Sequence, residues 1–504
     1  MSRGADEHRL AGGFLRLMSW YSLADGVATL LNVAGMLLTV RALSVEEFGV
    51  ADFLRTGQWF LLSLFSLNIF DSATRFYFDT TDPEERRRIL GGGLVVYLLS
   101  GFAAGAVVML CAPLSRKLLP VAVSARMLWL VALGIPASNL MTALTQTAVI
   151  RASARFYAGL VISQAVLVLL GISVLVMGMR LGLDGYFLAL LLAAGVAGIV
   201  GYFLQARQYR WNWLIGPLKH YISFGAPSMV TEMMHYGFGL FSRVVLLRWA
   251  SAVALGWYGF AERLQIPMHL TVVAAGRVWV PWLLAERPVP RQPVNRQVRQ
   301  LNGFVLVILG VVVIFLRELI LVIGGARYQR AYTAALLLLI AKWILFIGDY
   351  IVSASLTVAK QTHHRLWVFA IAYGAAALVG LWTIARWGST GVAMTMVVAS
   401  TLILLGMRIA SASVYPLKHD LRRLIPASGL ALGLAVWGSM HASLWIKPVF
   451  LAAYLLSLWR LGLFPAQGWG GVCSSEQSGA AAGLGDAAPL SPRQPGALVD
   501  SARR

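Results

Sequence analysis

The chain has 504 residues, of which 59% are hydrophobic and 12% are charged, whereas about a quarter of the residues in soluble domains are charged. A soluble core cannot bury this much apolar surface, so the composition excludes an ordinary soluble protein and indicates a chain whose solvent is mostly lipid. The formal net charge is +21, but the basic residues are spread over many short loops, which argues against nucleic acid as a partner.

Apolar runs recur along almost the whole chain. A helix needs roughly 20 apolar residues to cross a bilayer, and about fourteen runs approach that length. No run alternates apolar and polar residues, so we predict an all-α integral membrane protein with about 12–14 transmembrane helices and not a barrel. The expected spans lie near 14–40, 50–70, 90–112, 127–150, 157–178, 184–205, 221–249, 257–283, 302–323, 332–356, 366–386, 391–412, 425–441 and 444–464, the last two being short.

The loops between these runs predict the orientation. With the N-terminus in the cytoplasm, Lys and Arg number about 22 in the cytoplasmic loops against about 10 outside. We therefore expect both termini in the cytoplasm and basic loops in contact with anionic membrane lipids. No phosphate-binding loop, zinc-protease motif or nucleophile elbow occurs, no loop is long enough for a folded domain, and two cysteines are too few for a metal site. We expect no enzyme activity, no cofactor and no metal.

One stretch returns in altered form. TVRALSVEEFGVADFLRTGQ (39–58) aligns with LLRWASAVALGWYGFAERLQ (246–265) at an offset of 207 residues, and the same offset places Asp25 on Glu232. The offset covers six expected helices, an even number, so the halves share one orientation and form parallel repeats around a central cavity. We expect an N-terminal six-helix lobe at 1–206, an interfacial linker at 207–226, a C-terminal six-helix lobe at 227–412, two additional helices at 413–464, and a disordered cytoplasmic tail at 465–504.

Charged residues inside the apolar runs are the candidates for chemistry. A single charge at a helix centre costs about 2.5–3.5 kcal/mol on insertion scales, so each one must pair or face water. Polar residues recur at helical spacing around Asp25 and around Glu232 and His235, which turns one polar stripe of each helix towards a hydrated interior. Asp52 and Arg55 lie three residues apart on one helical face, and the alternative to a role in the cavity is that they pair with each other near the membrane surface.

Basic groups in such a cavity attract phosphate oxygens, and carboxylates in dry surroundings bind protons or cations. The alternative is a static network in which acids and bases neutralise each other. Arg277 has the further alternative of reaching the cytoplasmic surface. The candidates for substrate binding are Arg55, Arg243, Arg277 and Lys342, and those for ion coupling are Asp25, Glu232, His235 and Asp349.

The first hairpin, LLTVRALSVEEFGVADFLRTGQ (37–58), resembles that of polysaccharide-transport proteins, the O-antigen flippase family of the multidrug/oligosaccharidyl-lipid/polysaccharide (MOP) exporter superfamily. In that family Arg-x-Leu-Ser-x-Glu-Glu-Phe-Gly separates two apolar helices, and ATRFYFD (73–79) also fits. The resemblance covers residues 14–412. The second copy departs from the pattern, because SAVALG replaces the acidic turn.

The resemblance implies a flippase that moves an undecaprenyl-pyrophosphate-linked oligosaccharide across the bacterial inner membrane by alternating access, for O-antigen, lipopolysaccharide or exopolysaccharide synthesis. It also implies a proton or sodium ion as coupling ion and polysaccharide polymerase or export machinery as further partners. Two alternatives stay open. One is a drug/cation antiporter of the same superfamily, which the basic residues in the spans disfavour. The other is a membrane polymerase or ligase, which would need a longer outside loop.

Overall fold

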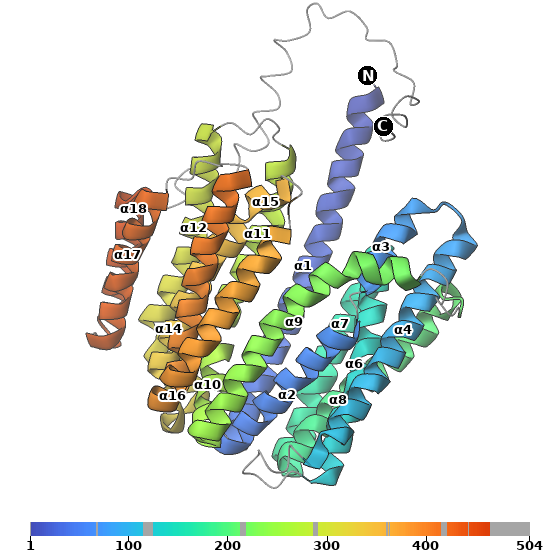
Figure 1. Cartoon of the computed structure of the whole chain (residues 1–504), viewed down its shortest axis with the longest axis horizontal. Coiled ribbons are helices and arrows are strands. Elements are labelled where there is room, and N and C mark those ends of the chain that lie inside the picture. The colour runs from blue at the N-terminus through green and yellow to red at the C-terminus, as the bar shows by residue number, and fades with distance from the viewer. Residues whose placement is uncertain are drawn as a thin grey trace, which may run out of the picture.

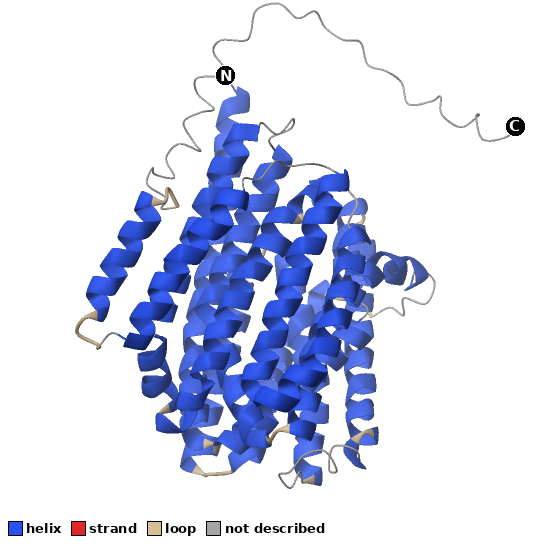
Figure 2. Cartoon of the chain, turned by 60° about the vertical axis from the view of Figure 1, so that its left-hand side comes forward, coloured by secondary structure: helices blue, strands red, loops and turns tan. Residues whose placement is uncertain are grey.

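The computed structural model describes residues 2–66, 69–113, 124–211, 218–285, 291–358, 361, 363–414, 421–441 and 443–463. Every regular element within these ranges is a helix, and none of the described residues lies in a strand (Figure 2). The predicted all-α class is therefore confirmed. The expected tail at 465–504 lies outside the described residues.

The first half of the chain forms one bundle, at the right of Figure 1. Within it α4 packs on α6, α6 on α8, and α1 on α7. Helix α7 continues directly into a short π-helix, and α8 continues directly into a short 3-10 turn. The elements are α1 (Ser2–Ala42), α2 (Val45–Ser66), α3 (Ile69–Asp79), α4 (Pro83–Leu110), α6 (Ala125–Ile150), α7 (Ala154–Gly171), the π-helix η1 (Ile172–Gly178), α8 (Gly182–Gln205) and the 3-10 turn η2 (Ala206–Gln208).

The second half forms the other bundle, in which α14 packs on α16, while α17 and α18 lie against α12 at the outer edge (Figure 1). The elements are α9 (Leu218–Trp249), α10 (Ala252–Arg263), α11 (Ile266–Ala285), α12 (Arg291–Ile314), α13 (Leu316–Gly324), the 3-10 turn η3 (Ala326–Ala331), α14 (Tyr332–Leu345), the π-helix η4 (Phe346–Val352), α15 (Ala354–Val358), α16 (His363–Val414), α17 (Leu421–His441) and α18 (Lys447–Arg460).

Eight helices in the described part are long and apolar enough to cross a membrane, which makes the chain a multi-pass membrane protein. The span His363–Ala412 contains two helices, because the backbone breaks at Gly388 with φ 54° and ψ −126°. This break falls between the two spans expected at 366–386 and 391–412. Some other expected spans carry more charge, as in α2, so the number of spans beyond these eight stays a prediction.

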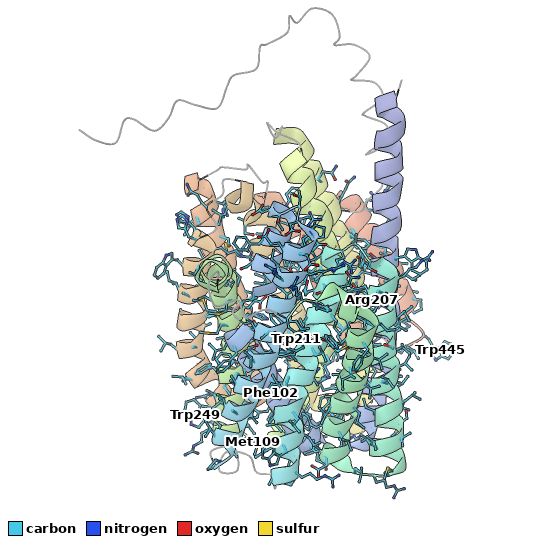
Figure 3. All side chains as sticks on the ribbon, turned by 90° about the vertical axis from the view of Figure 1, so that its right-hand side faces the viewer. Phe102, Met109, Arg207, Trp211, Trp249 and Trp445 are labelled. Atoms are coloured by element: carbon cyan, nitrogen blue, oxygen red, sulfur yellow. The ribbon has the colours of Figure 1, made fainter. Side chains whose placement is uncertain are left out.

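The outside of the bundle is covered with large apolar side chains, as expected for a surface in contact with lipid. Trp445 is 90% exposed, and Phe102 and Trp249 also project from the surface (Figure 3). Exposed apolar patches of this extent are rare on soluble proteins. The additional helices are anchored by polar contacts instead: the buried Lys447 donates to the carbonyl oxygen of Ile314 at 2.8 Å and pairs with Glu318.

The two lobes approach each other where α2 packs against α9 and α10, and they spread towards the end at which α1 begins (Figure 1). At the narrow end the repeat is visible in detail. Ser44 and Ser251, which the offset of 207 residues superimposes, each accept a hydrogen bond from a backbone N–H in the first turn of the following helix, at 3.1 Å in both cases. The predicted internal repeat is confirmed, whereas the predicted domain boundaries stay a prediction.

The predicted linker at 207–226 is described only in part. Arg210 at its start forms an ion pair with Glu84 of α4, and its backbone N–H donates to the carbonyl oxygen of Arg87 at 3.1 Å. Trp211 donates from its ring nitrogen to the hydroxyl of Tyr202 at 2.9 Å. These contacts attach the start of the linker to the first lobe, and its placement in the membrane interface stays a prediction.

Candidate functional site

Four charged side chains meet where α2 crosses α9 and α10. Nε of Arg243 donates to Oδ2 of Asp52 at 2.8 Å, and its other nitrogens reach Glu262 and the carbonyl oxygen of Gly239. Arg263 lies 3.4 Å from the second carboxylate oxygen of Asp52. The side chains of Arg243 and Asp52 are only 3% and 6% exposed. Charges this deeply buried are stable only when paired, so the cluster ties the two lobes together.

Neighbouring residues shape this cluster. A Cβ at position 259 would lie 2.7 Å from Cγ of Asp52, so the glycine of α10 leaves room for the acid. The guanidinium of Arg243 lies over the ring of Tyr258 at 5.1 Å, and that of Arg263 over the ring of Phe48 at 5.0 Å. The face of an aromatic ring attracts cations through its quadrupole, so these contacts help to stabilise both arginines in their positions.

The pairing of Asp52 with Arg55, which their spacing on α2 suggested, is wrong. Asp52 pairs with arginines of the other lobe, because α2 turns this face into the lobe interface. Arg55 instead contacts Oε1 of Gln58 at 3.5 Å and lies over the ring of Trp59 at 5.4 Å. No described carboxylate forms an ion pair with Arg55. Its positive charge is therefore not neutralised by a described acid, although the side chain is half-buried.

Lys342 of α14 is a second half-buried cation. No described residue forms an ion pair or a hydrogen bond with its ammonium group. Its charge acts repulsively on His235 and His269 and attractively on Glu262 and Asp349, which places all four within electrostatic range. Arg55 and Arg263, which lie on the two sides of the interface, also repel each other.

Each of the predicted acids has a partner. Oδ1 of Asp25 accepts a hydrogen bond from the hydroxyl of Tyr157 in α7 at 2.7 Å. Asp349 in η4 accepts two hydrogen bonds from Arg365 of α16, both at 2.9 Å, in the parallel geometry typical of arginine and carboxylate. Glu232 lies exposed on α9 and also interacts with its surroundings.

His235, one turn from Glu232, lies 3.0 Å from the hydroxyl of Tyr373 in α16 through its Nδ1. The side chain of Arg277 in α11 lies outside the described residues, so its predicted role stays untested. Among the residues that the structure describes, no group of three or more His, Cys, Asp or Glu side chains is placed to hold a metal ion.

Sequence reasoning missed Glu262, Arg263 and Arg365. The signal for the first was present in the repeat, because the offset of 207 residues places Glu262 on Arg55. Opposite charges at equivalent positions of a duplicated hairpin indicate a face where the two copies meet with complementary charge. Arg365 has no comparable signal, since a basic turn after a span is also typical of a cytoplasmic loop.

The chain was compared with known protein families, curated proteins and solved structures. No protein-family model and no curated protein matches the chain. A solved structure of the lipid II flippase MurJ in an inward closed conformation is similar with a TM-score of 0.71 and 14% identity, covering 88% of this chain and 97% of that chain. An inward-facing multidrug resistance MATE transporter of the MOP superfamily is similar with a TM-score of 0.61 and 13% identity, covering 77% and 95%.

A third similar structure is that of the MATE multidrug transporter DinF-BH, with a TM-score of 0.60 and 15% identity, covering 80% of this chain and 96% of that chain. Identities this low compare the fold and not the substrate. The shares covered show that these comparisons match both helical lobes of this chain. The chain therefore has the fold that the MurJ and MATE transporter structures share.

Proposed function

We propose that the chain is a flippase that moves an undecaprenyl-pyrophosphate-linked oligosaccharide across the bacterial inner membrane by alternating access, with both termini in the cytoplasm. The observation that carries this proposal is the charge balance at the lobe interface. Asp52 and Glu262 offset Arg243 and Arg263, whereas Arg55 and Lys342 add two positive charges that no described carboxylate pairs with. The field between the lobes is therefore suited to an anion.

A pyrophosphate that links a lipid to a sugar carries about two negative charges, which matches the two unpaired cations of this site. Arg55 belongs to the first lobe and Lys342 to the second, so a diphosphate that contacted both would be bound between the lobes. The guanidinium offers a planar fork of donors and the ammonium a compact charge, and both suit phosphate oxygens. Charge left unpaired inside a membrane protein is costly, so a matching anion is bound favourably.

The positive charge of Arg55 and Lys342 also favours one of the two transporters that have this fold. The drug/cation antiporter, which is the alternative, would have to draw an organic cation towards Arg55 and Lys342 against their repulsion. A polysaccharide polymerase or ligase would need a longer outside loop to hold its catalytic groups, and the sequence predicts no such loop. The fold and the charge together favour a flippase and not an enzyme.

We propose that Asp25, Glu232, His235 and Asp349 couple transport to a proton or sodium gradient. Asp25 and Glu232 are equivalent in the two halves, so movement of one lobe against the other changes the surroundings of both carboxylates. A group whose affinity for an ion differs between two conformations biases the equilibrium between them. Transport by Asp25→Asn and Glu232→Gln variants is expected to become slower and less dependent on the gradient, with Asp184→Asn as a control acid outside this group. Unchanged gradient dependence would make the acids structural.

Complementation of a flippase-deficient strain tests the substrate assignment. A deletion strain is expected to accumulate lipid-linked repeat units on the cytoplasmic leaflet, and the wild-type chain should clear them. Arg55→Ala and Lys342→Ala are expected to abolish complementation at normal protein level, while Arg55→Lys retains part of it because lysine lacks the bidentate fork.

Arg408→Gln, which removes an exposed arginine of α16, serves as the control and should complement fully. Full complementation by both alanine variants would contradict the assignment of Arg55 and Lys342 to the pyrophosphate. It would favour the antiporter instead.

A further inference from the structure

Two arginines join the lobes at the end where α1 passes into α2. Nη2 of Arg41, in the last turn of α1, donates to the carbonyl oxygen of Val322 in α13 at 2.9 Å. In the opposite direction, Nη2 of Arg327 in η3 donates to the carbonyl oxygens of Val40 and of Arg41, the latter at 3.0 Å. The final carbonyl groups of a helix have no partner within it, so each arginine completes the hydrogen bonding of a helix end in the other lobe.

The same two arginines are exposed and border a cavity of about 410 Å³ that is widely open at the surface. Its remaining lining is the end of α13 and the turn that follows, residues 321–326, and none of the lining residues is acidic. Neither arginine forms an ion pair with a described residue. Two positive charges that share a cavity without a carboxylate repel each other, and a bound anion would relieve that repulsion.

We propose that this cavity binds a phosphate-bearing anion, which bridges Arg41 and Arg327 and holds the lobes together at this end. A guanidinium has five N–H donors, and each of these arginines uses one nitrogen for its contact with the opposite lobe. The remaining donors form the planar fork that recognises phosphate oxygens. An anion that contacts both lobes binds only while they are close, so its binding favours the closed arrangement of this end.

The repeat supplies a matched control. Arg248 ends α9 as Arg41 ends α1, since the offset of 207 residues superimposes the two. Arg248 is exposed, and no described residue forms a hydrogen bond or an ion pair with it. Removing Arg248 therefore removes the same charge at the equivalent helix end without touching the bridge between the lobes.

The test measures the distance between the lobes in the purified full-length chain in neutral detergent. Spin labels at Met179→Cys and Gln329→Cys report on the two lobes, with Cys111 and Cys473 replaced by serine so that they take up no label. As inorganic pyrophosphate is added, the fraction of molecules with a short distance between the two labels is expected to rise and then to saturate. Arg41→Gln and Arg327→Gln each lose a hydrogen bond to a charged group. We therefore expect each variant to need a roughly tenfold to hundredfold higher pyrophosphate concentration at the midpoint.

Arg248→Gln should leave the midpoint unchanged. The proposal is overturned if the Arg41 and Arg327 variants respond to pyrophosphate as the parent does. It is also overturned if Arg248→Gln weakens the response as much as they do, because pyrophosphate would then be attracted to basic residues in general. Arg41→Gln and Arg327→Gln leave Arg55 and Lys342 in place, so a response that these two variants weaken is separate from pyrophosphate binding at the proposed substrate site.

A second arm identifies the source of the phosphate. The labelled chain is placed in nanodiscs of phosphatidylglycerol or of phosphatidylcholine, without pyrophosphate. A short distance in phosphatidylglycerol alone supports a lipid headgroup as the ligand, and a response to pyrophosphate alone supports a soluble phosphate. If neither pyrophosphate nor phosphatidylglycerol changes the distance, the cavity is not an anion site.

Discussion

The hairpins α1–α2 and α9–α10 are two copies of one motif, and they agree in what the backbone requires. Both place a serine at the start of the second helix, where its hydroxyl accepts a backbone N–H. A Cβ at position 49 would lie 2.6 Å from the backbone nitrogen of Gly256, so these two equivalent glycines touch. Contact between equivalent residues places the pseudo-two-fold axis of the repeat between them.

The two hairpins differ in charge, and the differences are complementary. Asp52 faces its own equivalent, Gly259, which leaves the space that the carboxylate fills. Arg55 has Glu262 as its equivalent, and Glu262 contributes to the pairing of Arg243. A duplicated hairpin has thus kept its turn and its contact while its charges diverged, so that one copy supplies an acid where the other supplies space.

The largest expected effect comes from removing the cation at the centre of this complementarity. Arg243→Ala leaves Asp52 and Glu262 without their shared partner, and breaking a buried ion pair costs about 3–5 kcal/mol. We expect a loss of that order in the free energy of unfolding, measured by chemical denaturation in mixed micelles. Arg248→Ala, on the exposed end of the same helix, should change stability little.

The pairing itself is tested by a double variant. Asp52→Asn combined with Arg243→Gln removes both charges and should recover part of the stability that Arg243→Ala loses. Additive losses would mean that the two residues act independently and that the crossing of the helices is held by other contacts.

A smaller effect is expected at the glycine contact. In Gly49→Ala the new Cβ would lie 2.6 Å from both the carbonyl oxygen of Ala252 and the nitrogen of Gly256, and backbone atoms cannot move aside as a side chain can. Overpacking of this kind costs about 1–3 kcal/mol. In Gly57→Ala, on the same helix α2, the Cβ meets nothing within 4 Å, so stability should rise by about 0.5–1 kcal/mol. Equal thermal stability of the two variants would contradict the close approach of the hairpins.

The smallest effect separates the two caps. Ser44 accepts from the backbone of Glu47 at 3.1 Å, and Glu47 accepts from the backbone of Ser44 at 2.8 Å, whereas Ala254 at the equivalent place offers no return contact to Ser251. Loss of a serine cap costs about 0.5–2 kcal/mol. We expect the stability lost in Ser44→Ala to be nearer the upper value, and that lost in Ser251→Ala to be nearer the lower value. Thermal unfolding of the two variants measures this difference. The reverse order would mean that the reciprocal pair adds nothing.

The sequence predicted the helical class and the repeat because both are periodic signals. Apolar runs of span length and the offset of 207 residues can be read without knowing any contact. The partner of Asp52 could not be read in the same way. Local spacing favoured Arg55, whereas the structure pairs Asp52 with Arg243, 191 residues away, because α2 turns that face towards α9.

The same limit applies to the candidate site. A charge within an apolar run is visible in the sequence, so Arg55 and Lys342 could be named as candidates. Whether a charge is neutralised depends on tertiary contacts between distant helices, such as that of Asp349 with Arg365. The distinction between paired and unpaired cations, on which the proposed function rests, comes only from the folded chain.

The most direct test of the proposed function is transport by the purified full-length chain in proteoliposomes that contain an undecaprenyl-pyrophosphate-linked oligosaccharide. The wild-type chain is expected to move this lipid between leaflets, measured by the fraction that an added glycosidase can reach. Arg55→Ala and Lys342→Ala should reduce that movement to the level of empty liposomes, while Arg408→Gln keeps it. A wild-type chain that leaves the anionic lipid in place but expels an organic cation would contradict the flippase assignment.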